Sequence, residues 1–141
     1  MGVKVYASED IRNIALVGHG SCGKTSIGEG LLFDTGAVSR LGSTREHTSI
    51  LDFEPEEQKR EGSIGSSFAW VEHEGKKINI IDTPGDGNFI YDAFTAMMGA
   101  DTAVVVISCP DSVEVQTSRV FNRAKELGIP QIVLINKMDR D

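Results

Sequence analysis

Apolar residues along this chain follow two alternating patterns, short continuous runs and helical spacing. Continuous runs, which favour strands, occupy residues 14–17, 68–71, 78–81, 103–107 and 132–135. Apolar positions recur at helical spacing within residues 27–32, 89–97 and 111–127. Because strands alternate with helices, the pattern predicts an α/β domain whose sheet is mostly parallel and carries helices on its faces.

Turn-forming residues mark the ends of several predicted elements. Gly36 can end the first helix, and Asp111 with Glu114 resembles a capping box that opens the third. The turn at residues 74–75 predicts a hairpin between the second and third strands, which makes the second strand the antiparallel one. Residues 37–63 are polar and charged, so we expect a long, mobile loop of the kind that is usually functional or disordered.

Composition narrows the class of protein. The chain has 141 residues, of which 40% are hydrophobic and 25% charged, values typical of one soluble globular domain. A net charge of −7 argues against intrinsic affinity for nucleic acids, because phosphates would be repelled over most of the surface. Two cysteines make no disulfide framework, and no apolar run approaches the roughly 20 residues of a membrane span. We therefore expect a cytoplasmic protein that does not enter membranes.

A glycine-rich segment between the first strand and the first helix matches the phosphate-binding loop pattern. Glycines let the backbone approach phosphates, and the helix N-terminus adds positive potential. Lys24 is expected to reach the β- and γ-phosphates and to neutralise charge in the transition state, and Thr25 to bind Mg²⁺. The residues expected to contact nucleotide here are Gly18, His19, Gly20, Ser21, Cys22, Gly23, Lys24, Thr25 and Ser26.

A second motif, Asp-Thr-Pro-Gly at residues 82–85, directly follows the third strand. A carboxylate at the tip of a buried strand beside a phosphate loop is placed to hold Mg²⁺, so Asp82 is a candidate metal residue acting through water. The N–H of Gly85 is a candidate sensor of the γ-phosphate. Taken alone, the motif is as well explained by a plain Pro-Gly turn after a strand.

A third motif, Asn-Lys-Met-Asp at residues 136–139, follows the last strand. The carboxylate of Asp139 can accept two hydrogen bonds from the ring N–H and exocyclic amine of guanine, a pair that adenine lacks. Asn136 is expected to brace the phosphate loop, and Lys137 to lie along the base. This motif too could be only a polar junction between strand and loop.

In combination the three motifs predict a three-layer P-loop NTPase domain, similar to Ras-like GTPases, that binds GTP or GDP with Mg²⁺. The expected reaction is slow hydrolysis of the β–γ bond by a positioned water. An ATP-using P-loop enzyme stays open as an alternative, although Asp139 argues against it.

The motifs and their flanks resemble the N-terminal part of elongation factor G and its paralogues, over nearly all of the chain and most closely the paralogues sometimes called second copies. The likeness rests on the Gly-His start of the phosphate loop and on residues 9–15, 32–36, 78–85 and 136–140. The resemblance implies a translation factor that acts on the ribosome, with the loop at 37–63 and the segment after Asp82 ordering with GTP. A regulatory GTPase that switches a protein partner outside translation is the alternative.

Two positions depart from the pattern of that family. Its first switch carries Arg-Gly-Ile-Thr-Ile, whereas residues 60–64 here place Ser63 where the metal-binding Thr is expected. Ser63 is thus a metal candidate, or a solvated loop serine. Asp86 stands where the family has a His that positions the attacking water, so hydrolysis stimulated by the ribosome should be weak or triggered differently. Asp86 could instead merely cap the helix that starts near Phe89.

The resemblance also implies that residues 1–141 form an incomplete GTP-binding domain. Complete domains of that family have a further strand and helix, a guanine-contacting Ser-Ala loop and later domains. We therefore expect the last strand of this chain to leave an unpaired sheet edge. We also expect its affinity for GTP to be lower than that of a longer protein.

Overall fold

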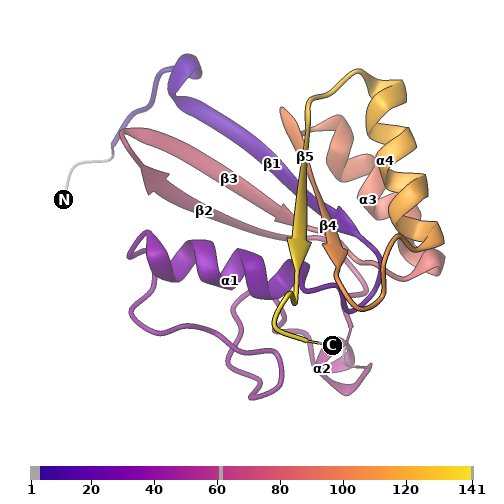
Figure 1. Ribbon diagram of the computed structural model, residues 1–141. Coiled ribbons are helices and arrows are strands. Elements are labelled where there is room, and N and C mark those ends of the chain that lie inside the picture. The colour runs from indigo at the N-terminus through magenta and orange to yellow at the C-terminus, as the bar shows by residue number, and fades with distance from the viewer. Residues whose placement is uncertain (1–3, 61, 141) are drawn as a thin grey trace.

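The computed structural model, which describes residues 4–60 and 62–140, contains one five-stranded sheet (Figure 1). The strands are β1 (Ile11–Gly18), β2 (Ser67–His73), β3 (Lys76–Asp82), β4 (Thr102–Ser108) and β5 (Gln131–Asn136). The α-helices are α1 (Lys24–Asp34), α2 (Pro55–Arg60), α3 (Ile90–Met98) and α4 (Val115–Leu127). The short 3-10 helices Ser8–Asp10 and Gly87–Phe89 precede β1 and α3.

Strand order across the sheet is β2-β3-β1-β4-β5. β1 pairs in parallel with both β3 and β4, and β4 pairs in parallel with β5. Only β2 runs antiparallel to its neighbour, joined to β3 by a turn in which Glu74 and Gly75 both have positive φ. The predicted hairpin and the mostly parallel sheet are both confirmed.

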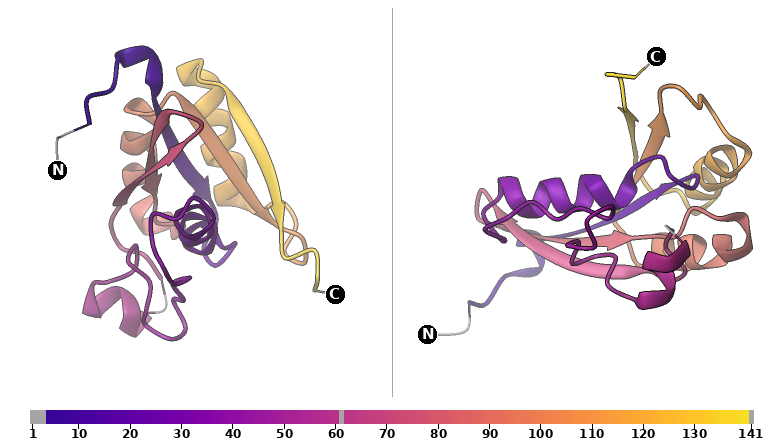
Figure 2. Two further views of the ribbon diagram at one scale, coloured as in Figure 1. Left: turned by 90° about the vertical axis from the view of Figure 1, so that its left-hand side faces the viewer. Right: turned by 90° about the horizontal axis from the view of Figure 1, so that it is seen from below.

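Helices cover both faces of the sheet and make three layers (Figure 2). On one face α3 and α4 pack on the inward side chains of β1, β3 and β4, in a core that includes Ala15, Val105 and Met97. On the other face α1 packs against Leu16, Val71 and neighbouring apolar residues. Consecutive strand residues point to opposite faces, so the continuous apolar runs seen in the sequence supply both cores.

The expectation that residues 37–63 form one long loop is wrong in part, because they contain α2. The signals for this helix are present in the sequence. Pro55 occupies its first position, where the missing N–H is harmless, and Glu56 and Glu57 fall in the first turn. The segment also buries Leu51 in the core beside α1.

The helix ends agree only partly with the sequence prediction. α1 ends at Asp34 with Thr35 as its C-cap residue, and Gly36, with φ of 74°, comes directly after this cap, where a helix-ending glycine is expected. The prediction of a capping box is wrong, because α4 begins at Val115 and its N-cap residue Glu114 makes no side-chain capping bond. The side chain of Asp111 instead lies 3.7 Å from Nε2 of His19 in the phosphate loop.

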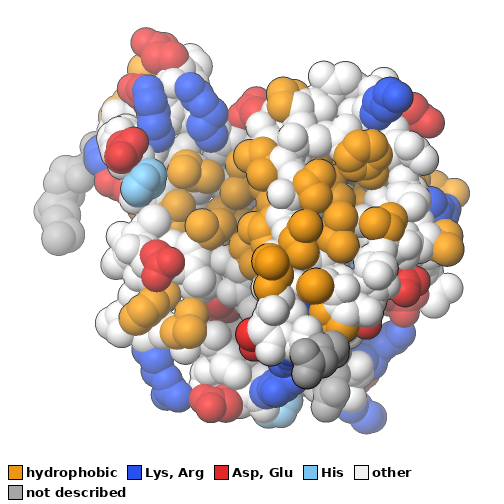
Figure 3. Space-filling view, in the orientation of Figure 1, with side chains coloured by type: hydrophobic (Ala, Val, Ile, Leu, Met, Phe, Trp, Pro, Cys, Tyr) orange, Lys and Arg blue, Asp and Glu red, His pale blue; other side chains and the backbone are white. Residues whose placement is uncertain are grey.

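β5 lies at one edge of the sheet in the described part of the chain, as predicted. Hydrophobic side chains gather on the surface over β5 in the view of Figure 3. Ile132, Val133 and Ile135 are each at least half exposed. This strand therefore presents apolar side chains, together with backbone groups that pair with no further strand of the described residues.

Candidate functional site

The three motifs converge at one edge of the sheet. In parallel strands the carboxyl ends lie at the same edge, and β1, β3 and β5 each end in one motif. Leu16 of β1 is in register with Asp82 of β3, and Ser108 of β4 with Asn136 of β5. Sequence stretches more than 50 residues apart are thereby brought into contact.

The glycine-rich loop is held in a tight turn between β1 and α1. Gly23 has φ of 101°, and a Cβ at this position would collide with the side chain of Asn136, so only glycine fits without strain. The ammonium of Lys24 is buried and donates to the carbonyl of His19 at 2.7 Å and to that of Gly18 at 3.3 Å. The loop thus curls around its own lysine, at the N-terminus of an 11-residue helix.

The motif after β5 braces this loop. The side-chain amide of Asn136 donates to the carbonyl of Cys22 at 2.9 Å, and Nζ of Lys137 donates to the carbonyl of Ser21 at 2.6 Å. Asp139 lies in the exposed turn that follows and does not line the adjoining cavity. The structure therefore brings Asn136 and Lys137 onto the phosphate loop and leaves Asp139 at its margin.

Thr25 and Asp82 meet directly, although they lie 57 residues apart in the chain. The Thr25 hydroxyl donates to Oδ2 of Asp82 at 2.6 Å. Asp82 is only 1% exposed, and its Oδ1 has no hydrogen-bond partner among the described residues. Burial raises the pKa of the Asp82 carboxyl to about 6, against the opposing effects of the Thr25 bond and of Lys24.

Gly85 and Asp86 follow immediately beside the phosphate loop. A Cβ on Gly85 would collide with the backbone of His19 and Gly20, so the two segments touch through their main chains. Oδ1 of Asp86 accepts from the N–H of Asn88 at 2.9 Å, so Asp86 caps the short 3-10 helix Gly87–Phe89 and not α3 itself, whose N-cap residue is Phe89. Its Oδ2 lies 3.8 Å from a guanidinium nitrogen of Arg60 in α2.

These segments enclose a cavity of about 870 Å³. One part of its lining comes from the phosphate loop and the start of α1, and another part, which we call the rim, from the segment between α1 and β2. The lining residues are Gly20, Ser21, Gly23, Lys24, Thr25, Ser26, Leu41, Gly42, Ser43, Thr44, Arg45, His47, Asp52, Arg60, Gly62, Ser63, Gly85, Asp86, Phe89, Lys137 and Arg140. Ser63 therefore faces the same space as Thr25.

Several buried acidic residues at this site escaped the sequence analysis. Glu29 in α1, Asp52 and Glu57 are each at least 95% buried. Oε1 of Glu57 accepts from the N–H groups of Ile64 and Gly65, and burial followed by the charge of Glu57 raises the pKa of Asp52. The sequence gives only a weak signal for the burial of these residues. For Glu29 the signal is a charged residue between two glycines of a helix.

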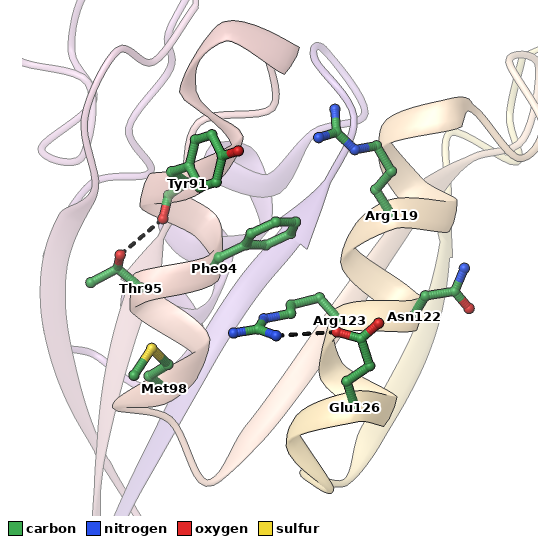
Figure 4. Close-up of a pocket in the computed structure, with 8 residues that line it drawn as sticks. All are labelled: Tyr91, Phe94, Thr95, Met98, Arg119, Asn122, Arg123 and Glu126. Atoms are coloured by element: carbon green, nitrogen blue, oxygen red, sulfur yellow. Dashed lines mark hydrogen bonds and ion pairs between the residues drawn. The ribbon is translucent and has the colours of Figure 1, made fainter.

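A second cavity, of about 600 Å³, lies between α3 and α4 (Figure 4). Phe94 lies near its centre, with the Tyr91 ring edge-on at 5.9 Å and the Arg123 guanidinium 5.7 Å from the Phe94 ring centre. Arg123 also pairs with Glu126 at 3.1 Å. None of the residues singled out in the sequence motifs lines this cavity.

No group of three His, Cys, Asp or Glu side chains in the described chain is placed to hold a metal ion. None of the helices within residues 4–60 and 62–140 has both the length and the apolar character needed to span a bilayer.

Known proteins resemble this chain in sequence and in structure. Residues 9–141 match the family described as the elongation factor Tu GTP binding domain. The chain is 38% identical over 130 residues to the mitochondrial ribosome-releasing factor 2 of Debaryomyces hansenii, which covers 92% of this chain and 15% of that protein. A crystal structure from Thermus thermophilus superposes with a TM-score of 0.89 at 36% identity, over 93% of this chain and 20% of that one.

A bacterial selenocysteine-specific elongation factor, EF-Sec, superposes with a TM-score of 0.73 at 28% identity. The match covers 92% of this chain and 20% of that factor. The chain therefore spans a fifth or less of the length of each of these relatives.

Proposed function

Because this chain belongs to the family of elongation factor Tu GTP-binding domains, and thus to the translational GTPases, we propose that it binds GTP with Mg²⁺ and hydrolyses it as part of a longer factor acting on the ribosome. The observation that carries the proposal is the meeting of all three motifs around one cavity. Kinship with translational GTPases of the elongation factor G type, expected from the motifs, is confirmed by the matches. In this proposal residues 1–141 are the first part of the GTP-binding domain.

The phosphates would lie on the glycine-rich loop. In the structure the Lys24 ammonium donates hydrogen bonds to the carbonyls of Gly18 and His19. A charged phosphate oxygen is a stronger acceptor for it than these carbonyls. Lys24 would then neutralise the charge that develops as the β–γ bond breaks. The N–H of Gly85, whose backbone lies against the loop, would meet the terminal phosphate.

The donor set beside Lys24 fits Mg²⁺. This ion takes oxygen ligands, and it usually binds through one or two carboxylates together with substrate phosphates and waters. Asp82 offers a buried oxygen with no partner in the described chain, and Thr25 a hydroxyl 2.6 Å from the other oxygen. We propose that Thr25 and Ser63 hold the ion directly and Asp82 through water. When bound, the ion supplies positive charge that offsets the charge on the phosphates.

Guanine recognition is assigned to the carboxylate of Asp139, on the pairing argument given above. The test is calorimetric titration of GDP and ADP into the wild-type chain and the Asp139→Asn variant. GDP should bind far more tightly than ADP, and Asp139→Asn should weaken GDP binding by roughly 100-fold, as expected for the loss of a hydrogen bond to a charged group. Asp34→Asn, an exposed change at the end of α1, is the matched control. Equal affinities for GDP and ADP would refute the assignment.

Hydrolysis in this protein is proposed to be slow or differently triggered because of Asp86. Its carboxylate caps the turn before α3 and lies near Arg60, and an ionised carboxylate cannot donate a hydrogen bond to a water. Single-turnover GTPase rates with ribosomes should rise on Asp86→His. A wild-type rate equal to that of an ordinary elongation factor would overturn this part of the proposal.

Action on the ribosome is tested separately by co-sedimentation of the longer protein with ribosomes. A non-hydrolysable GTP analogue should promote binding and GDP should not. Failure to bind in either state would favour a GTPase that works outside translation. A cytoplasmic site of action stays a prediction, and the relative from Debaryomyces hansenii is by name a mitochondrial protein.

A further inference from the structure

Glu29 has no role in the motifs, yet its carboxylate is among the most buried polar groups of the molecule. It lies in the second turn of α1 and is 1% exposed. Oε1 accepts three hydrogen bonds, from the hydroxyl of Ser49 at 2.6 Å, the N–H of Ile50 at 2.8 Å and the N–H of Leu51 at 3.1 Å. Because buried donors are costly to leave unpaired, these three hydrogen bonds make the Glu29 side chain an anchor for the segment 49–51.

The second carboxylate oxygen touches the other side of the same loop. Oε2 has no hydrogen-bond partner among the described residues, and a Cβ added at Gly42 would collide with it. Between these two contact points the loop is closed on itself. The N–H of Thr48 donates to the carbonyl of Ser43 at 3.0 Å, and the N–H of Ser43 donates to the Thr48 hydroxyl at 3.0 Å. Glu29 therefore clamps the neck of a small loop that spans residues 42–49.

That loop forms part of the rim of the cavity described above. Residues 41–45, His47 and Asp52 all line it, together with Thr25 and Gly85. Beyond the clamp, Leu51 is buried in the core, and its carbonyl accepts from the Ser67 hydroxyl at 2.6 Å. The rim is thus tied to α1 by Glu29 and to β2 by Ser67.

We propose that Glu29 is a positioning residue that holds the loop at residues 41–52 closed over the nucleotide, an inference that rests on the proposed GTP binding. Without the carboxylate, the donors of Ser49, Ile50 and Leu51 are buried and unpaired, which favours release of the loop to water. The continuation of this loop brings Arg60 within 3.8 Å of Asp86, next to the assigned contact of Gly85 with the terminal phosphate. Opening the loop therefore weakens the triphosphate state more than the diphosphate state.

The experiment uses the full chain with two variants that disturb the clamp from opposite sides. Glu29→Ala removes the acceptor of the three hydrogen bonds from Ser49, Ile50 and Leu51. Gly42→Ala leaves the carboxylate intact and pushes it with a methyl group. Gly65→Ala is the control, since a Cβ there meets nothing within 4 Å. The readouts are hydrogen exchange at Ile50 and Leu51 and the release rates of GDP and a non-hydrolysable GTP analogue.

Both clamp variants should lose protection at Ile50 and Leu51 and release the GTP analogue about tenfold faster, with GDP release changed less than about twofold, as expected for the loss of buried hydrogen bonds. Gly65→Ala should match wild type. If Glu29→Ala does not fold, Gly42→Ala decides alone. Variants that release the analogue at the wild-type rate overturn the role of Glu29 only. A wild-type chain that binds neither nucleotide overturns the proposed function and this inference with it.

Discussion

Asp82 shows how one buried side chain can couple stability to ligand binding. Its carboxylate is held by the Thr25 hydroxyl on one oxygen, while no described residue bonds the other. Burial raises its pKa from 3.8 to about 6, because the charged form is poorly solvated. The unliganded chain is thus destabilised near neutral pH by a charge that a nearby cation would offset.

This destabilisation predicts a pH dependence. Between about pH 6 and pH 4 the folded chain holds a proton on Asp82 that the unfolded chain has lost, so stability rises as the pH falls through this window. A shift of roughly two units corresponds to about 3 kcal/mol. Asp82→Asn should reduce this rise when urea unfolding of nucleotide-free chains is followed from pH 7 to pH 4. Equal pH dependence in wild type and variant would contradict the assignment.

At the scale of elements, helix α1 contains two glycines, Gly28 and Gly30, whose surroundings differ. Each glycine in a helix interior costs about 1 kcal/mol relative to alanine. A Cβ on Gly28 would come within 2.5 Å of Cδ1 of the buried Leu51, whereas a Cβ on Gly30 meets nothing within 4 Å. Gly28 is therefore required by the packing of the loop on the helix, and Gly30 is not.

Paired substitutions test this reading of α1. Gly30→Ala should stabilise the chain by about 1 kcal/mol through helix propensity alone. Gly28→Ala should instead destabilise it by about 1 kcal/mol, since overpacking a core commonly costs more than the propensity gained. Thermal or urea unfolding of the two variants measures both effects. A stabilising Gly28→Ala would show that the loop does not pack on the helix as described.

A second prediction at the scale of elements concerns the edge strand β5. An edge strand with exposed apolar side chains is a template for pairing with another chain. Val133→Lys should therefore lower the self-association of the 141-residue chain in sedimentation experiments at high concentration. Val133 is 50% exposed, so the fold should tolerate the lysine. Val115→Lys, at the exposed start of α4, is the control and should leave self-association unchanged.

At the scale of the whole molecule, nucleotide binding should increase the free energy of unfolding of the chain. The site joins α1, β3, β5 and the long connecting loop, so ligand that binds only the folded chain stabilises all of them together. At 100 times its Kd, GDP with Mg²⁺ should add about 2.7 kcal/mol and raise Tm by roughly 5–10 °C for a chain of this size. ATP at the same concentration should leave Tm unchanged. A shift produced equally by ATP would contradict guanine selectivity.

The sequence alone was sufficient for the fold class, because strand and helix patterns are local properties of the chain. It was also sufficient to locate the phosphate loop, Asp82 and Asn136. In a parallel α/β sheet the strand ends meet at one edge, so motifs that follow strands must come together. Turn chemistry of the same local kind placed the hairpin, and it placed the end of α1 just before Gly36.

Tertiary structure alone decided which polar groups became buried. Glu29 looks like an exposed helix residue until Ser49, Ile50 and Leu51, some 20 residues away, fold over it. Asp111 fits a helix cap locally but lies against His19, and Asp86 both caps a turn and lies near Arg60. The energetic effect of a buried polar or charged group depends on partners from distant parts of the chain, and local sequence patterns do not identify those partners.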